Sequence, residues 1–540
     1  MSSCKVFGEG SCPLELEEIG KKIAQNCRGL PLAVAVIGGL LSKATKTPHY
    51  WRTIAKNVSS EITSNGEQCS KILSLSYKHL PYHLKGCYLF MGIFPEDYPI
   101  NVKVLTKLWV AEGILKPACS KTLEDVGEEY FFDLVQRSLI LVQQKGSSGK
   151  IRTCRIHDLL RDLCVQEAQK EKFFHVIEGS LYGIQGDTSM RRVSIHDKKN
   201  SPYYQFYHAA KGTFKGDDKT LSSFDSRLLK VLHNKAYDHL PDGMEELVNM
   251  RYFYYYRNTD APIYKLRNLQ TIVIWNHRGH IILPPEIWRM SQLRHVKLDG
   301  YIHLPDPPSS EIKGEENSIV VLENLQTLSR MYNFRLTEEV LKRIPNLRKL
   351  AIDYNMVASW EEYYINNFVH LAKLESLKCY LKYPEPGFVL EMTFLTSLKK
   401  LTLHGIFLSN NELTILGKMP NLEVLKLKNS NFASSTWKPK EGEFLKLKCL
   451  QLCRSELKYW IADSIHFPSL DRLVIVQCDK LEDIPSGFGE ISTLQSIELF
   501  HDKYYGDTSA YSDSIVESAK KIEEEQLSWG NDAFKLYIKD

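Results

Sequence analysis

Leu422-Glu-Val-Leu-Lys-Leu427 and Leu447-Lys-Cys-Leu-Gln-Leu452 are two copies of one pattern, a leucine triplet with the spacing L-x-x-L-x-L. Isoleucine, valine, methionine or an aromatic residue replaces leucine in some copies. The copies begin at Leu229, Met250, Leu269, Leu293, Leu325, Leu347, Leu374, Leu398, Leu422, Leu447, Leu470 and Leu494. Their mean step is about 24 residues, which lies within the range of known 20- to 29-residue solenoid repeats.

This period predicts a leucine-rich-repeat solenoid. Each triplet forms a short strand whose leucines point into the core, while the residues between them face the concave solvent side. One unit cannot bury its apolar side alone, so the core forms only when several units stack. Unrelated amphipathic helices would instead give a 3.6-residue period, which the triplets lack. The wide step from Leu293 to Leu325 contains three prolines and predicts a loop insertion.

Composition sets the broad class of protein. A chain of 540 residues is too long for one compact core, so we expect two to four domains. Basic and acidic residues nearly cancel, at 69 and 65, and give no nucleic-acid signal. Twelve cysteines without C-x-x-C pairs indicate a reducing compartment. The sequence shows neither a secretory signal nor an apolar run of membrane length, so we expect the protein in the cytoplasm or peripherally at a membrane.

Upstream of the repeats, residues 13–43 predict two helices joined by a turn. The second helix is apolar on every side and must be buried. The turn between them contains Gly29-Leu30-Pro31-Leu32-Ala33. This stretch resembles the G-L-P-L-A motif in the nucleotide-binding domain of plant leucine-rich-repeat immune receptors and related apoptotic ATPases.

The segment from Ile72 to Leu115 extends this resemblance. Its motifs are, in order, Leu75-Ser-Tyr77, Leu80-Pro81, Leu84-Lys-Gly-Cys87, Phe94-Pro-Glu-Asp97 and Leu108-Trp109. They are similar to the start of the winged-helix domain in the coiled-coil class of these receptors, in its late-blight-resistance-like branch. Read from the residues alone, 84–94 and 102–115 predict two helices, and 139–142 and 151–156 predict the strands of a hairpin.

The residues of this region also argue against two other functions. A winged helix is related to DNA-binding folds, but acidic residues dominate its later helices and no basic recognition face is present, so we expect no DNA binding. The predicted hairpin tip, Gly146-Ser-Ser-Gly149-Lys150, superficially suggests a phosphate loop. That loop requires a glycine at 144 and Ser or Thr at 151, where Gln144 and Ile151 stand, so a two-stranded wing fits better.

Ile156-His157-Asp158 ends the second predicted strand. In the resembled receptors this place holds M-H-D, whose histidine approaches the β-phosphate of bound ADP and keeps the receptor closed. An imidazole can donate to a phosphate oxygen, which makes His157 a candidate phosphate ligand. The resemblance places Asp158 with it among the nucleotide-binding residues. The alternative is a histidine satisfied by a helix cap, with Asp158 as that cap.

The predicted architecture is a multidomain α+β chain with a helical domain, a winged-helix domain and an α/β leucine-rich-repeat solenoid. We assign 1–75 to the helical part, 76–178 to the winged helix, 179–228 to a linker and solenoid cap, 229–513 to about twelve repeats, and 514–540 to a capping helix and tail. Compared with the resembled receptors, a coiled coil and a phosphate-loop domain are expected to be missing, so we expect no enzymatic hydrolysis by this chain. ADP or ATP is implied for the full-length protein, with contacts at Gly29, Leu30, Pro31, Leu32 and His157.

The concave face offers candidate contacts with a partner protein. Its outward positions include Tyr254, Tyr256, Trp275, Lys378, Tyr380, His404, Lys426 and Lys428. The aromatic residues of the early repeats suggest an intramolecular contact with the winged-helix domain that holds an off state. Lys426 and Lys428 are open to two interpretations, a solvated charged face or a contact with an acidic partner.

Two functions are consistent with these features. The resemblance implies a disease resistance receptor, an ADP-dependent switch whose repeats sense a pathogen effector or a guarded host protein, trigger defence and the hypersensitive response, and lead to an oligomer on activation. The alternative is a recognition scaffold or decoy that binds a partner without nucleotide switching.

Overall fold

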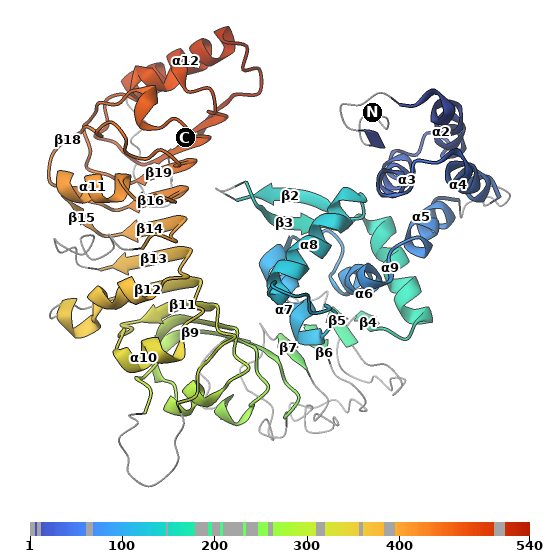
Figure 1. The fold of residues 1–540 in the computed structure, drawn as a ribbon, viewed down its shortest axis with the longest axis horizontal. Helices are drawn as coiled ribbons and strands as arrows, with labels where there is room; N and C mark the ends of the chain where they lie inside the picture. The colour runs from blue at the N-terminus through green and yellow to red at the C-terminus, as the bar shows by residue number, and fades with distance from the viewer. Residues whose placement is uncertain are drawn as a thin grey trace. The chain divides into compact units, whose positions relative to one another are not determined.

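The computed structural model describes residues 6–7, 12–60, 68–146, 149–178, 193–196, 206–208, 230–233, 247–256, 263–308, 319–355, 360–382, 395–501 and 513–539. The chain forms two compact units, Met1–Tyr256 and Arg257–Asp540 (Figure 1). The first contains helices, a small antiparallel sheet and further short strands, and the second contains stacked parallel strands. The predicted combination of a helical region, a winged helix and a repeat solenoid is confirmed.

The first unit begins with four helices, α2 (Leu14–Asn26), α3 (Pro31–Lys43), α4 (Pro48–Ser60) and α5 (Gln68–Lys78). The turn between α2 and α3 places Arg28 and Gly29 at φ of 50° and 73°, a left-handed conformation that ends α2. Pro31 is the first residue of α3, where its missing N–H costs nothing. As predicted, α3 is buried along most of its length, against α2, α4 and α5.

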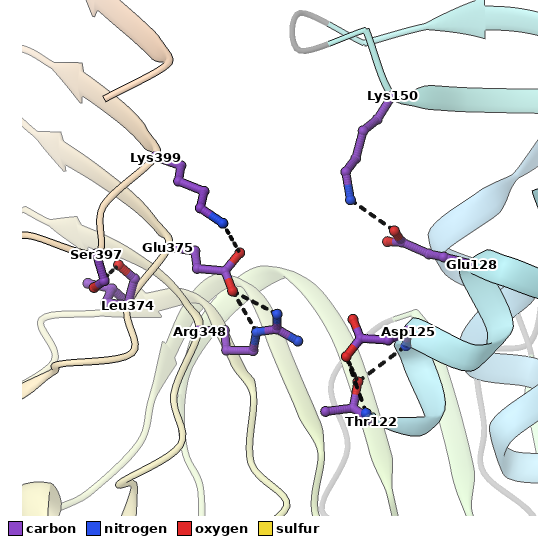
Figure 2. Close-up of polar contacts among 9 residues, drawn as sticks. All are labelled: Thr122, Asp125, Glu128, Lys150, Arg348, Leu374, Glu375, Ser397 and Lys399. Carbon is purple, nitrogen blue, oxygen red and sulfur yellow. Dashed lines mark hydrogen bonds and ion pairs between the residues drawn. The ribbon is translucent and has the colours of Figure 1, made fainter. Parts of the chain in front are cut away.

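The winged helix follows. Its elements are α6 (Tyr82–Phe90), η2 (Met91–Ile93), β1 (Ile100–Asn101), α7 (Val102–Glu112), α8 (Leu123–Gln136), β2 (Leu141–Lys145), β3 (Ile151–Arg155) and α9 (Asp158–Lys170). The three strands form an antiparallel sheet in the order β1-β3-β2. Asn101 caps α7, and a reciprocal capping box between Thr122 and Asp125 starts α8 (Figure 2). The predicted hairpin and both predicted helices are therefore present, with ends shifted by up to four residues.

A close backbone contact locks the helical part onto the winged helix. A Cβ atom at Gly39 of α3 would lie 2.2 Å from the carbonyl oxygen of Arg137, at the end of α8, so only glycine fits. Next to this contact, Lys43 forms an ion pair with Asp133, with Nζ 3.4 Å from Oδ1. The glycine-proline turn at the start of α3 is thus rigidly connected to the winged helix.

Short strands complete the first unit: β4 (His175–Glu178), β5 (Val193–His196), β6 (Phe206–His208), β7 (Val231–His233) and β8 (Tyr252–Tyr256). β4 pairs with β5 in parallel, β6 with β7 antiparallel, and β7 with β8 in parallel. β7 and β8 carry the first two leucine triplets, which the sequence assigned to the solenoid. In the structure these two strands belong to the same compact unit as the winged helix.

The second unit is a solenoid of parallel strands in chain order (Figure 1). They are β9 (Thr271–Ile282), β10 (His295–His303), β11 (Thr327–Tyr332), β12 (Lys349–Tyr354), β13 (Ser376–Leu381), β14 (Lys400–His404), β16 (Val424–Lys428), β19 (Cys449–Cys453), β21 (Arg472–Val476), β22 (Ser496–Phe500) and β23 (Lys535–Lys539). The register places triplet leucines side by side, as in Leu377, Leu401 and Leu425, all fully buried. The opposite flank carries mostly 3-10 turns and the short helices α10 (Glu338–Arg343) and α11 (Asn410–Gly417).

The solenoid ends in a helix and one further strand. The predicted tail helix at 514–527 is present as α12 (Asp513–Ser528). It caps the last repeat through Gln526, whose buried side-chain amide donates to the carbonyl groups of Gly489 and Ile491 at 2.7 and 3.0 Å. β23 then extends the sheet by pairing with β22, which the sequence analysis did not foresee. Its triplet begins with Ala533 instead of leucine and follows a long step, so the repeat signal is weak there.

Candidate functional site

His157 is the N-cap of α9 in the structure. Its backbone is extended, with φ −69° and ψ 141°, and its Nδ1 accepts a hydrogen bond from the Leu159 backbone N–H at 3.3 Å. The histidine is therefore satisfied by a helix-cap hydrogen bond, as the alternative interpretation expected. That interpretation was wrong about the capping residue, because Asp158 is the first helical residue and is exposed. Ile156 is anchored in the core beside it, which makes His157 the last residue outside the helix.

The cap has a chemical consequence for the imidazole. Because Nδ1 accepts from a backbone N–H, the proton of the neutral ring is on Nε2. Nε2 is then a hydrogen-bond donor beside the N-terminus of a 13-residue helix, where the helix dipole favours negative charge. A half-buried hydrogen-bond donor in this place suits a phosphate oxygen.

The position of α9, and so of His157, is fixed by buried polar contacts. Arg161 donates from Nε to the carbonyl oxygen of Phe94 at 2.7 Å, with its side chain buried. One turn later, the thiol of Cys164 lies 3.3 Å from the carbonyl oxygen of Tyr88. A Cβ atom at Gly92 would lie 2.8 Å from Cβ of Cys164, so α9 packs closely on the turn after α6.

The turn residues Gly29, Leu30 and Pro31 lie at the surface of the same unit. Leu30 is the N-cap of α3 with 38% of its surface exposed, and Gly29 and Pro31 are exposed too. Leu32 instead packs against the winged-helix core. α5 packs on both α3 and α9, and the Tyr77 hydroxyl of α5 donates to Glu171 after α9 at 2.5 Å. The exposed apolar turn and His157, the predicted phosphate ligand, are thus held by one connected set of helices.

Strand β8 brings aromatic residues into the winged-helix core, and β7 adds a valine. Val231 and Tyr252 are fully buried members of that core, and Tyr254 is half-buried against it. Burial raises the pKa of Tyr252 well above its ordinary value. The side chain of Tyr256 lies outside the described residues. Sequence analysis missed Tyr252, although the run of five aromatic residues 252–256 was a signal that both faces of the strand are covered.

The predicted concave residues of the second unit lie in rows that cross the parallel strands. One row contains Asp353, Tyr380, His404 and Lys428, and a second contains Lys378, Thr402 and Lys426. Trp275 lies on β9, and the Lys297 ammonium is 4.3 Å from the centroid of its ring. The geometry of these side chains follows the leucine spacing, and their role in binding stays a prediction.

Charge is distributed unevenly along this face. Towards its start, Arg330 pairs with Asp299 at 3.2 Å, and towards its end Arg472 donates to Glu498 at 2.7 Å. Between these pairs, neither Lys426 nor Lys428 forms an ion pair with any side chain that the structure describes. Burial lowers the pKa of Lys426, and the charges of Lys428 and Lys378 lower it further. Burial, and then Lys428, likewise lower the pKa of His404.

A separate row of charges runs where the strands begin. We call it the edge ladder, and it consists of the residue after the first leucine in successive triplets: Arg348, Glu375, Lys399, Glu423, Lys448 and Asp471. Each backbone N–H donates to the carbonyl oxygen of the preceding member, so the side chains are neighbours. Glu375 accepts from Arg348 at 2.7 Å and lies 3.9 Å from Lys399 (Figure 2). Sequence analysis missed this ladder, although its members share one position in the triplet.

Other features were searched within the described residues. No group of three or more His, Cys, Asp or Glu side chains in this part of the chain could hold a metal ion. None of its helices combines the length and apolar character needed to cross a membrane. On the winged helix, Glu128 of α8 pairs with Lys150 at 2.9 Å (Figure 2).

Comparison with known proteins places this architecture in context. Residues 93–164 match the family model described as the winged helix domain of disease resistance proteins. The chain is 32% identical over 576 residues to a putative late blight resistance protein homolog of Solanum demissum, which covers 99% of this chain and 42% of the relative. A late blight resistance protein of the same species gives the same identity and the same coverage. The chain therefore spans less than half the length of these relatives, and the predicted resemblance is confirmed.

A structural comparison found an internalin from Listeria monocytogenes, with a TM-score of 0.35 and 14% identity over 58% of this chain and 87% of that chain. The assignment of the repeat fold rests instead on the parallel register of β9 to β23.

Proposed function

From its similarity to late blight resistance proteins along 99% of its length, we propose that this chain is the switch-and-sensor part of a plant disease resistance receptor. The observation that carries the proposal is that this similarity spans both a winged helix and a repeat solenoid. In this proposal the first unit holds the closed state through a bound nucleotide. The solenoid recognises a pathogen effector or a guarded host protein and favours the open state, which triggers defence and the hypersensitive response.

ADP is the proposed ligand of the first unit. Its β-phosphate would accept from Nε2 of His157, with the N-terminus of α9 favouring the negative charge. The exposed turn Gly29–Leu30–Pro31 would supply apolar contact to the adenine. ADP gives the switch a negatively charged group that binds one conformation better than the other, which is what a population shift requires.

The intramolecular contact is the second element of the proposed off state. Tyr252 and Tyr254 pack on the winged-helix core through β8, a strand that carries a leucine triplet. Movement of the repeats would pull on this strand and so on the winged helix. The half-buried Tyr254 is the residue whose contact can be lost without opening the core.

Two substitutions of His157 in the full-length receptor test the nucleotide switch. His157→Asn keeps an N-cap, because asparagine caps helices well, but it removes the Nε2 donor. His157→Ala removes both. We expect both variants to bind ADP about tenfold or more weakly, as for loss of a hydrogen bond to a charged group, and to trigger cell death without an elicitor.

The two variants distinguish a role of His157 in the nucleotide switch from a role as a helix cap alone. If His157→Asn matches the wild type in ADP affinity and resting activity while His157→Ala does not, His157 is only a helix cap. If neither variant changes ADP affinity or activity, the chain acts as a recognition scaffold without nucleotide switching. Nucleotide affinity is measured with purified protein, and activity in leaves that express equal amounts of each variant.

A further inference from the structure

Two sets of charged side chains cross the same repeats of the solenoid. In the edge ladder the sign alternates from strand to strand, from Arg348 and Glu375 to Lys448 and Asp471. Each charge therefore has an opposite charge on the neighbouring repeat, as Figure 2 shows for Glu375 between Arg348 and Lys399. This row is neutralised within the molecule.

The concave face of the same repeats is different. We call Lys378, Lys426 and Lys428 the lysine patch; it lies on β13 and β16, with β14 between them. Lys378 is exposed, and the other two lysines are half-buried. The chain pairs its concave charges before the patch, at Arg330 and Asp299, and after it, at Arg472 and Glu498. In the patch, charges of one sign come together, because Lys428 and Lys378 both lie close enough to Lys426 to lower its pKa.

We propose that the lysine patch binds an acidic segment of another protein, with two carboxylates meeting Lys378 and Lys426. This inference rests on the proposed function, in which the repeats recognise a protein, and it names the chemistry of the part that is recognised. Charge complementarity carries it, because an arrangement of like charges in the middle of a binding face favours an anionic partner.

The spacing of the patch defines the segment. Adjacent strands lie about 4.8 Å apart, so Lys378 and Lys426, two strands apart in one row, are about 10 Å apart. An extended chain advances about 3.3 Å per residue, so positions i and i+3 span the same distance. The smaller side chain of Thr402 lies between the two lysines. An acidic segment that crosses the strands with carboxylates three residues apart therefore fits.

Lys428 can hold the same segment from the side. It lies two residues beyond Lys426 on β16, about 7 Å along the strand, in the row that contains Tyr380 and His404. Burial and neighbouring lysines lower the pKa of Lys426, so the charged form of this side chain is destabilised in the free protein. A carboxylate beside it would offset that destabilisation.

A protein segment fits better than a nucleic acid. The patch has only three lysines, whereas a nucleic acid presents a long series of phosphates that needs many cations. Asp353 lies one strand before Tyr380 in one row, and Glu498 lies in the row of Lys426 towards the C-terminus. These carboxylates would repel a polyanion that extended past the patch, and they limit the anion to a short stretch.

The test measures binding of a short fluorescent peptide by anisotropy, using the complete 540-residue chain. The peptide carries two glutamates three positions apart, with a proline between them to keep it extended, and a second peptide carries glutamines instead. The variant Lys378→Met with Lys426→Met removes two charges from the patch. The matched control, Lys399→Met with Lys448→Met, removes two lysines from the edge ladder of the same repeats.

We expect the patch variant to weaken binding of the glutamate peptide about tenfold at low salt, from two lost charge contacts. The edge control should change it less than about twofold, because Lys399 and Lys448 already have Glu375 and Glu423 as neighbours in the edge ladder. Lys378→Arg with Lys426→Arg, which keeps the charge, should retain binding, and the glutamine peptide should not bind.

Three results would overturn the proposal: equal loss in the patch and edge variants, no binding of the glutamate peptide, or tighter binding of single-stranded oligothymidylate that is lost in the patch variant. The last result would identify a nucleic acid as the partner. None of these results depends on nucleotide or on cell death, so a failure here leaves the tests of His157 unaffected.

Discussion

The edge ladder and the lysine patch belong to the same repeats, but their charges are arranged in opposite ways. Along the edge ladder, neighbouring repeats supply opposite charges, and Glu375 is shared by Arg348 and Lys399. On the concave face, Lys426 is half-buried near Lys428 and Lys378, which have the same sign. The solenoid pairs charges between repeats along its edge, whereas neither Lys426 nor Lys428 on the concave face forms an ion pair with a described side chain. The difference marks the patch as a place where stability is given up for binding.

Glu375→Gln should have the largest effect, because it breaks the edge ladder at its best-paired member. The substitution removes a carboxylate 2.8 Å from Nε and 2.7 Å from Nη2 of Arg348 and leaves Arg348 and Lys399 facing each other. The pair is about one-third exposed, so we expect a loss of about 1 kcal/mol in the free energy of unfolding. Urea unfolding of the full chain measures it, and hydrogen exchange in β12 to β14 localises it.

Lys448→Gln is the control for this substitution, because its ammonium is 3.9 Å from Glu423 and the pair is more exposed. Its loss should be smaller than that of Glu375→Gln. Binding of the glutamate peptide should be the same in both variants and in the wild type. Equal stability of Glu375→Gln and wild type would show that the alternating signs have no energetic role.

The sequence predicts the residues of the concave face better than those of the edge ladder, for a physical reason. The leucine spacing determines which residues alternate with the core, so the outward positions of Lys378, His404 and Lys426 follow from the triplet alone. The edge ladder depends on which residues become neighbours across strands that are 23 to 27 residues apart in sequence, as with Arg348 and Glu375. Aligning the triplets shows that the signs alternate from repeat to repeat. That these side chains are neighbours follows only from the parallel register.

Features set by packing between distant elements were out of reach of the sequence. His157 rather than Asp158 caps α9, because Ile156 is anchored in the core and fixes where the helix begins. Tyr252 is buried in the winged-helix core although its triplet belongs to the repeat pattern. The triplet of β23 has Ala533 in place of the first leucine, two residues before the strand, so a search for leucine misses this repeat.

Lys426→Met should stabilise the folded protein, whereas most substitutions destabilise it. It keeps the aliphatic stem and removes a half-buried charge that lies close to two other lysines, so we expect an increase of about 0.5 kcal/mol in the free energy of unfolding. The same variant should bind the glutamate peptide more weakly. Urea unfolding and anisotropy on one preparation measure both effects.

Lys399→Met is the counterpart in the edge ladder, and it should lower stability without affecting the peptide. A loss of stability in Lys426→Met would contradict the comparison, since it would mean that the patch lysine stabilises the fold as the edge lysines do.

Acidification should give the smallest effect, through His404 beside Lys428. Burial and Lys428 lower the pKa of His404 in the folded protein, and Asn429 Nδ2, which can only donate, lies 3.2 Å from its Nε2. Because the folded pKa lies below the unfolded value of about 6.5, the unfolded chain binds more protons in that interval. Stability is therefore full above about pH 6.5 and is lost as the pH falls from there through the folded pKa.

Peptide binding should change in the opposite direction over the same interval. Protonated His404 adds a positive charge next to Lys428, while glutamate, with an ordinary pKa of about 4.3, stays ionised. We expect the peptide to bind about twofold more tightly at pH 5.5 than at pH 7.5. Asp353, whose pKa is raised by burial, also titrates on the acid side, so His404→Gln is the control that retains it. If His404→Gln kept the full pH dependence of binding, that effect would belong to Asp353, whose protonation removes a negative charge from the same row. Because its pKa is raised, Asp353 adds stability as the pH falls, so a loss of stability that persisted in His404→Gln would belong to neither residue. Either result would mean that His404 does not act on the patch.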